Sequence, residues 1–254
     1  MRAIILSAGQ GKRLLPLTAD TPKCLLAVQD EVSILEFQLQ TLATCGVREA
    51  SVIVGFGADR VDAALAIRPI SGLTVRTVYN PFYAQSDNLA TAWLARSEMS
   101  GDFLLLNGDT LFTAEVLNRL LASPDAPLTL AINVKDVYDD DDMKVSLEDG
   151  TRLTAVGKTL PAERIDGESI GLMLFRGGGG KAFRTALETT IREPEALTLW
   201  YLSVLDRLSD SLRNETANIT GMWWGEIDSP NDLTEVRKAL STAGTSESRT
   251  SYGQ

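Results

Sequence analysis

Several charged residues in this chain have the types and spacing for phosphate chemistry. A small-residue loop at 7–11 follows the apolar, β-prone run 3–6 and leads at once into the cations Lys12 and Arg13. Glycines let the backbone approach a ligand closely, the N–H groups of such a turn bind anions, and an arginine can grip two phosphate oxygens. The order strand, loop, cations therefore predicts a phosphate-binding turn.

Carboxylates near the ends of predicted strands are the candidate metal ligands. Asp109 follows the apolar run 103–106, and Glu226 and Asp228 stand two positions apart. On an extended strand, carboxylates two positions apart face the same way. Such oxygen ligands suit Mg²⁺ held against a triphosphate. Each aspartate also has a simpler interpretation, since Asp109 can cap the next helix and Asp228 can begin the last one.

Two common phosphate-binding motifs are excluded. A Walker A loop needs a glycine where Leu6 stands and a Ser or Thr where Arg13 stands, and a dinucleotide fingerprint needs a small residue where Leu14 stands. The loop by itself is equally compatible with an ordinary strand-to-helix turn. Its continuation favours the phosphate, because Lys23 brings a second cation just before a second apolar run at 24–28.

With that continuation, the chain resembles the nucleotidyltransferases that make NDP-sugars and CDP-alcohols. The matching residues are Leu6, Ser7, Ala8, Gly9, Gly11, Arg13, Leu14, Pro16, Leu17, Thr18, Thr21, Pro22 and Lys23. The resemblance extends over residues 1–240 and is closest to the branch of phosphocholine, phosphonate and inositol-phosphate cytidylyltransferases. It implies the nucleotide-diphospho-sugar transferase type of fold.

The resemblance also implies roles for individual residues. The expected catalytic residues are Arg13 on the departing pyrophosphate, Lys23 on the α-phosphate, and Asp109 and Asp228, which with Glu226 would hold Mg²⁺. The expected nucleotide-binding residues are Leu6, Ala8, Gly9, Gln10, Gly11, Lys12, Asn80, Tyr83, Asp87 and Asn88. Side-chain amides in the loop 80–88 suit a nucleobase, although Ser86 or Asp87 can instead cap the following helix.

On the acceptor side the sequence is less specific. The expected acceptor-binding residues are Lys144, Lys158, Glu168 and Trp200. A choline acceptor would call for an aromatic cage around its ammonium. Met143 and Leu202 stand where the phosphocholine enzymes keep an aromatic and an acidic residue, so that cage is incomplete. We expect instead a small alcohol phosphate, a phosphonate, an amino-acid-derived phosphate or a sugar 1-phosphate.

The activity implied is attack by a phosphate or phosphonate oxygen on the α-phosphorus of an NTP, with release of pyrophosphate. CTP is the favoured donor. One alternative is a sugar-1-phosphate nucleotidyltransferase that uses UTP or GTP. A second, from another class, is a non-catalytic nucleotide-sensing subunit, against which the joint presence of Arg13, Lys23, Asp109 and Asp228 argues.

The elements that must position these residues alternate along the chain. Apolar runs at 3–6, 50–55, 73–79, 103–106, 128–134 and 172–175 alternate with helical patterns at 34–44, 59–67, 90–98, 181–191 and 197–208. This predicts an α/β fold with a Rossmann-like, open, mostly parallel sheet flanked by helices, which binds ligands at the carboxyl ends of its strands. Segments 143–147 and 153–157 predict a small β-hairpin near the acceptor, and the acidic run 139–142 a solvated loop.

Composition bounds the remaining possibilities. The chain has 254 residues, which we divide into one domain at 1–240 and a Ser/Thr-rich tail at 241–254 that is expected to be disordered. The net charge of −10 argues against binding nucleic acid or an anionic membrane. Histidine is absent, which removes His-based triads and leaves carboxylates, lysines and arginines for chemistry.

The cysteines and the hydropathy suggest a location. Cys24 and Cys45 lie in apolar contexts without metal-ligand spacing, and we expect buried free thiols in a reducing compartment. A signal sequence and a membrane-spanning run are both absent from the pattern, so we expect a cytoplasmic protein. The expected partners are the NTP and the acceptor, and a homodimer is left open.

Overall fold

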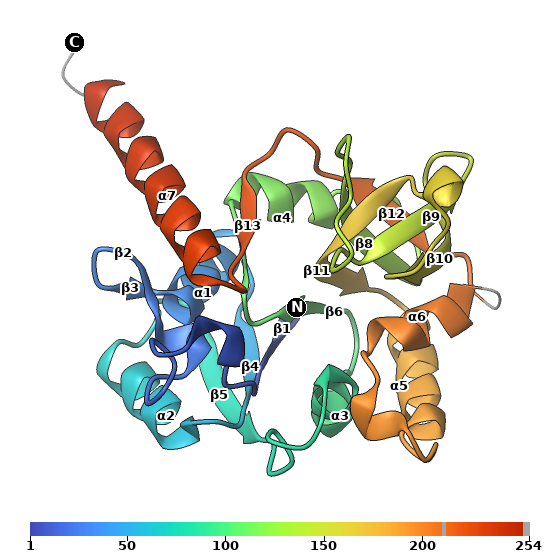
Figure 1. Cartoon of the computed structure of the whole chain (residues 1–254), viewed down its shortest axis with the longest axis horizontal. Coiled ribbons are helices and arrows are strands. Elements are labelled where there is room, and N and C mark those ends of the chain that lie inside the picture. Colours follow the sequence, from blue (N-terminus) through green and yellow to red (C-terminus); the bar gives the residue numbers. More distant parts are fainter. Residues whose placement is uncertain (210–211, 251–254) are drawn as a thin grey trace.

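One mixed sheet of nine strands organises the computed structural model, which describes residues 1–209 and 212–250, with side chains to residue 242 (Figure 1). The strand order is β5-β4-β1-β6-β11-β8-β12-β10-β9. The strands are β1 (Arg2–Ser7), β4 (Glu49–Val54), β5 (Thr74–Tyr79), β6 (Phe103–Asn107), β8 (Leu128–Asn133), β9 (Lys144–Glu148), β10 (Arg152–Gly157), β11 (Gly167–Phe175) and β12 (Glu215–Asn218). Two short ribbons pair β2 (Ala27–Gln29) with β3 (Val32–Ser33) and β7 (Thr110–Phe112) with β13 (Trp224–Glu226).

Helices cover both faces of this sheet. They are α1 (Ile34–Thr44), α2 (Ala58–Ile67), α3 (Asn88–Leu94), α4 (Ala114–Leu121), α5 (Gly179–Thr190) and α6 (Leu202–Ser209). The last helix, α7 (Pro230–Thr250), packs instead on the short strands β2 and β13. Successive residues of a strand point to opposite faces. In β1, Ala3 and Ile5 pack with α1, α2 and α4, whereas Ile4 and Leu6 pack with α3, α5 and α6. The predicted α/β fold with helices on both faces is therefore confirmed.

The sheet divides into a parallel and a mainly antiparallel part. Strands β5, β4, β1 and β6 run parallel, and β11 then lies antiparallel between β6 and β8. Parallel pairing needs a crossover connection, usually a helix. Because β11 follows the β9–β10 hairpin without such a helix, the sheet is less parallel than the sequence pattern suggests. β9 also pairs with β11 at Gly167 and Glu168, which closes a ring through β8, β12 and β10.

Several predicted elements have the expected bounds, and others do not. The helix predicted at 34–44 is α1, and the hydroxyl of Ser33 caps it by accepting from the backbone N–H of Glu36. The single helix predicted at 197–208 is instead a 3₁₀ turn, Ala196–Thr198, followed by α6. Between them, the backbone N–H of Tyr201 donates to the side chain of Asn88, which fixes this break.

The C-terminal helix α7 projects from the body of the molecule (Figure 1). Its apolar face packs through Leu233, Val236 and Leu240. The helix runs to Thr250, past the boundary at 241 after which disorder is expected, and residues 251–254 lie outside the described residues. No helix in the described part of the chain is long and apolar enough to cross a membrane.

Candidate active site

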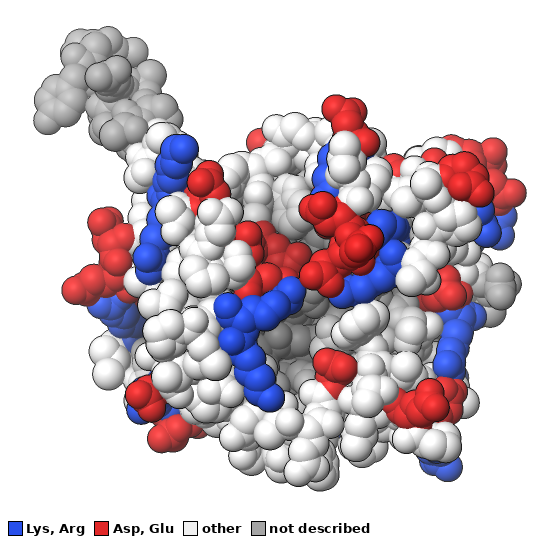
Figure 2. Space-filling model, in the orientation of Figure 1, with Lys and Arg blue, Asp and Glu red and all other residues white. Residues whose placement is uncertain are grey.

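A cavity of about 800 Å³ opens at the carboxyl ends of β1 and β6, between the two parts of the sheet. Figure 2 shows acidic and basic side chains meeting across the hollow in this face. Most of the predicted site residues line it. These are Leu6, Ala8, Gly9, Arg13, Tyr83, Asp87, Asn88, Asp109, Lys158, Glu168, Trp200, Glu226 and Asp228.

Lys23 lies beneath the cavity at the centre of a charged cluster. Its ammonium donates to Oδ2 of Asp109 at 2.7 Å and to Oδ1 of Asp228 at 2.8 Å. Arg13 contacts the second oxygen of Asp228 at 2.8 Å. Burial alone would lower the pKa of Lys23, but the charges of Asp109 and Asp228 raise it above the ordinary 10.5. Lys23 is therefore a permanent cation, and the four residues predicted as catalytic lie together.

The turn that carries Arg13 is built against Lys23. Gly11 has a φ of +74°, and a Cβ there would lie 3.0 Å from the Cβ of Lys23. The hydroxyl of Thr18 donates to the carbonyl of Gly11 at 2.8 Å and holds the loop closed. The side-chain amide of Gln10 donates to the carbonyl of Thr18, and Gly11 packs on Lys23. Neither Gln10 nor Gly11 therefore lines the cavity. Lys12 does not line the cavity either.

Asp109 and Asp228 are fixed through their backbones. The side-chain amide of Gln38, on the buried face of α1, donates to the carbonyls of Asn107 at 2.8 Å and Thr110 at 2.7 Å. These two carbonyls flank the turn that presents Asp109. At the start of α7, the carboxylate of Asp232 accepts from the backbone N–H groups of Asp228 and Ser229.

The three predicted metal ligands fit a divalent cation. One carboxylate oxygen from each of Asp109, Glu226 and Asp228 lies within 4.8 Å of the others. Oδ1 of Asp109 is buried without a hydrogen-bond partner, which leaves a ligand oxygen free. Glu226 is open to the cavity on one side, while the protein around it and the charges of Asp109 and Asp228 raise its pKa to about 8. An oxygen-only set of this kind suits Mg²⁺.

The loop expected to bind the base is only partly turned toward the cavity. Tyr83, Asp87 and Asn88 line the cavity, and burial raises the pKa of Asp87. Asn80 does not line it. Its buried side chain donates to the hydroxyl of Thr91 at 3.0 Å and accepts from the backbone N–H of Phe82 at 2.8 Å, so it shapes the loop.

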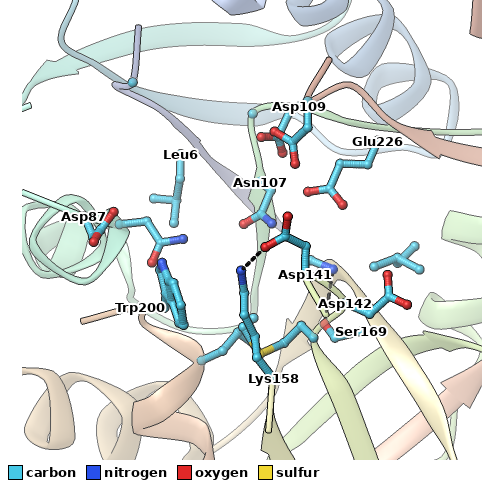
Figure 3. Close-up of a pocket in the computed structure, with 18 of the residues that line it drawn as sticks. Leu6, Asp87, Asn107, Asp109, Asp141, Asp142, Lys158, Ser169, Trp200 and Glu226 are labelled. Carbon is cyan, nitrogen blue, oxygen red and sulfur yellow. Dashed lines mark hydrogen bonds and ion pairs between the residues drawn. The ribbon is translucent and has the colours of Figure 1, made fainter. Parts of the chain in front are cut away.

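The opposite wall of the cavity carries two lysines, Lys135 and Lys158, of which Lys158 is labelled in Figure 3. The ammonium of Lys158 lies 4.4 Å above the ring of Trp200 and 3.1 Å from Asp141, which also contacts Arg13 at 3.5 Å. Lys135 bridges Asp142 and Glu168 at 2.7 Å each. Lys135 was not singled out from the sequence, although its position just after β8 was the available signal.

Lys144 differs from the other predicted acceptor residues. Its buried ammonium donates to the backbone carbonyls of Asp139 and Lys158, and it does not line the cavity. It thus ties the acidic loop to the hairpin and has no free donor directed at a ligand. Asn107, also missed from the sequence, lines the cavity and accepts a hydrogen bond from Tyr201.

Comparison with known proteins agrees with this arrangement. Residues 2–138 match the profile of a protein family described as nucleotidyl transferase. The chain belongs to this nucleotidyl transferase family. That confirms the resemblance inferred from the motifs, and the matched segment includes Arg13, Lys23 and Asp109 of the charged cluster.

Individual members of the nucleotidyl transferase family are similar over part or all of the chain. The CMP-5'-(3-aminopropyl)phosphonate synthase of Streptomyces rubellomurinus is 37% identical over 52% of this chain and 20% of its own length. The choline-phosphate cytidylyltransferase of Streptococcus pneumoniae is 32% identical over 48% of this chain and 51% of its own. The alignments thus span about half or less of these relatives. The inositol-1-phosphate CTP transferase of T. maritima has the same fold, with a TM-score of 0.78, 22% identity and 94% of each chain covered.

Proposed function

We propose that this nucleotidyltransferase is a Mg²⁺-dependent cytidylyltransferase that transfers CMP from CTP to a small phosphate or phosphonate acceptor and releases pyrophosphate. The observation that carries the proposal is the pair of facing cationic groups in one cavity. Arg13 lies on one wall, above Lys23, and Lys135 and Lys158 lie on the other. Two anionic substrates can thus be held face to face. The names of the relatives above support CMP as the transferred group.

The chain's own residues act by positioning and charge. Arg13 binds oxygens of the departing pyrophosphate, and Lys23 binds the α-phosphate. On substrate binding, each of these cations replaces an ion pair with an aspartate by a contact with a phosphate oxygen. The acceptor oxygen forms a bond to the α-phosphorus, the bond to the β-phosphate oxygen breaks, and the electron pair leaves with pyrophosphate. Phosphate and phosphonate oxygens are already anionic, so no residue has to remove a proton.

Asp109, Asp228 and Glu226 are the residues that would hold Mg²⁺, which supplies charge neutralisation at the phosphates when bound. The other parts of the site serve recognition. Asn88 and Asp87 stand where the loop after β5 meets the cavity and can contact the base. Lys135 takes over the acceptor role that the sequence gave to Lys144.

The contact between Lys158 and the ring of Trp200 argues against phosphocholine as the acceptor. Lys158 already lies over the ring of Trp200, and Met143 and Leu202 line the cavity beside it. A quaternary ammonium would have to displace this lysine and would find neither a second ring nor an acid at those two positions. We therefore favour acceptors in which the phosphate or phosphonate is the main recognised group.

A matrix of donors and acceptors tests the proposal. Each of the four NTPs is incubated with Mg²⁺ and with 3-aminopropylphosphonate, phosphocholine, inositol 1-phosphate or glucose 1-phosphate, and pyrophosphate is measured. We expect turnover to be fastest with CTP and to stop in EDTA. Preference for UTP or GTP with glucose 1-phosphate would instead support the sugar nucleotidyltransferase. Tight NTP binding without turnover would support the sensor.

A further inference from the structure

Asn107 ends β6, the strand at which the parallel and antiparallel parts of the sheet meet. On one side its register partner is Leu6 of β1, beside the phosphate-binding loop. On the other side β11 runs antiparallel, with Leu172 opposite Leu106, which brings Gly171 beside Asn107. The strand order also reverses between β1 and β6, with β4 and β5 on one side of β1 and β6 on the other, and ligands bind at such a point in open sheets. Asn107 therefore lies between the two walls of the cavity. We call them the nucleotide wall, with Arg13 above Lys23, and the acceptor wall, with Lys135 and Lys158.

The side chain of Asn107 is held by a buried tyrosine. The hydroxyl of Tyr201, which is fully buried, donates to Oδ1 of Asn107 at 2.9 Å. Burial raises the pKa of this phenol, and the charges of Asp109 and Glu226 raise it further, so the hydroxyl keeps its proton. A donor of this kind selects the carbonyl end of the amide as its partner. The amide orientation of Asn107 is thereby fixed.

The other end of the amide is free to donate. Nδ2 of Asn107 lies so close to Gly171 that a Cβ there would be 2.3 Å away, and the φ of +70° at Gly171 matches the absence of a side chain. No hydrogen-bond acceptor for Nδ2 is found within residues 1–209 and 212–250, and Asn107 lines the cavity. Figure 3 shows the side chain between Leu6 and Glu226 in that view. The amide nitrogen thus retains donor capacity for a substrate.

We propose that Asn107, with its amide oriented by Tyr201, donates a hydrogen bond from Nδ2 to a non-bridging oxygen of the phosphate group that is transferred. This inference rests on the proposed function. It makes Asn107 a substrate-contacting residue and Tyr201 a positioning residue that acts through it. A neutral donor suits this place, because the nearby carboxylates Asp109 and Glu226 repel a phosphate, and a preorganised N–H offsets part of that repulsion. No proton is transferred.

A double-mutant cycle tests whether Tyr201 acts through Asn107. We expect Asn107→Ala to lower kcat about 100-fold, the usual effect of losing one preorganised donor. We expect Tyr201→Phe to lower kcat about tenfold, in line with one lost hydrogen bond, with the KM for CTP changed less than threefold. In the Asn107→Ala background, Tyr201→Phe should have little further effect. Tyr79→Phe, at an exposed position on β5, is the matched control.

A second measurement does not depend on turnover. The side-chain amide signal of Asn107, assigned by its loss in Asn107→Ala, is followed by NMR as Mg²⁺ and the inert α,β-methylene analogue of CTP are added. A large shift of this signal in the wild type and a smaller one in Tyr201→Phe support the inference. Independent, multiplicative effects in the cycle, or a signal that stays unchanged at saturating nucleotide, would overturn it.

The two proposals fail in different ways. A wild-type chain that binds CTP and shifts the Asn107 signal, yet releases no pyrophosphate with any acceptor, refutes the catalytic function and leaves Asn107 as a nucleotide contact. Normal turnover with an unaffected Asn107→Ala variant refutes only the role of Asn107. Absence of any nucleotide binding refutes both.

Discussion

The two walls of the cavity hold their cations in different ways. On the nucleotide wall, Lys23 is buried, with 12% of its side chain exposed, and is bonded to two carboxylates that are themselves fixed by the backbone. On the acceptor wall, Lys158 pairs with Asp141, whose side chain is 78% exposed. Buried pairs lose much when one partner is removed, whereas exposed pairs contribute little. The Lys23 cluster on the nucleotide wall is therefore preorganised, and the Lys158 pair on the acceptor wall is adaptable.

Removing a metal ligand tests the preorganised wall most severely. Asp109→Ala should lower turnover by about three orders of magnitude or more, because the free oxygen that fits the cation is lost. Pyrophosphate release at saturating substrates measures this. Asp125→Asn, at an exposed loop position outside the cavity, should retain normal turnover. Near-normal activity of Asp109→Ala would contradict the assigned metal site.

Removing the buried cation tests what holds that wall together. In EDTA, Lys23→Met should lower the free energy of unfolding by about 2 kcal/mol, since Asp109 loses the ammonium that pairs with it and Asp228 keeps only Arg13. Addition of Mg²⁺ should restore part of this loss, because it binds only the folded site. Urea denaturation with and without Mg²⁺ measures both effects. The exposed Lys238→Met is the control, and equal stability of the two variants would show that the pairing contributes nothing.

On the acceptor wall we expect smaller and more selective effects. Lys135→Met and Lys158→Met should each raise the KM for the acceptor about tenfold, as expected for one lost charged contact, and leave the KM for CTP unchanged. Lys144→Met should instead lower stability, because its buried ammonium donates to two backbone carbonyls. Steady-state kinetics with each substrate varied in turn separates these outcomes. A raised KM for CTP would place these lysines with the triphosphate.

Proton competition at the metal site provides the smallest expected effect. A pKa of about 8 means that Glu226 is largely protonated at pH 7, so a divalent cation must displace its proton. Mg²⁺ affinity should therefore rise as the pH increases from 6.5 to 8, by at most about tenfold per pH unit, and level off above that. Calorimetric titration of the protein with Mg²⁺ measures this. In Glu226→Gln the affinity should be lower and its pH dependence lost, and an unchanged profile would remove Glu226 from the ligand set.

Local patterns in the sequence were sufficient for three residues of the charged cluster, although not for Asn80 or Lys12, which do not line the cavity. Arg13, Lys23 and Asp109 each follow or join an apolar run, and strands β1 and β6 pair directly in parallel, so their carboxyl ends meet. The helix α1 was also predictable, because its apolar spacing and its Ser33 cap are both local. The ends of strands and the starts of helices are encoded within a few residues. The charged residues of this wall lie in the loops directly after such strand ends, which is why they could be predicted.

The acceptor wall was decided by tertiary structure. Lys135 and Lys144 are both cations beside a strand, and only the pairing of β9 with β11 turns Lys144 inward to backbone carbonyls. The contact of Tyr201 with Asn107 spans 94 positions and depends on the break before α6. A shift of one residue in a strand's register reverses which face a side chain occupies. The sequence by itself thus determined the family and most residues of the charged cluster around Lys23. The fold decided which polar groups line the opposite side of the cavity, because long-range strand register is not encoded in any short segment.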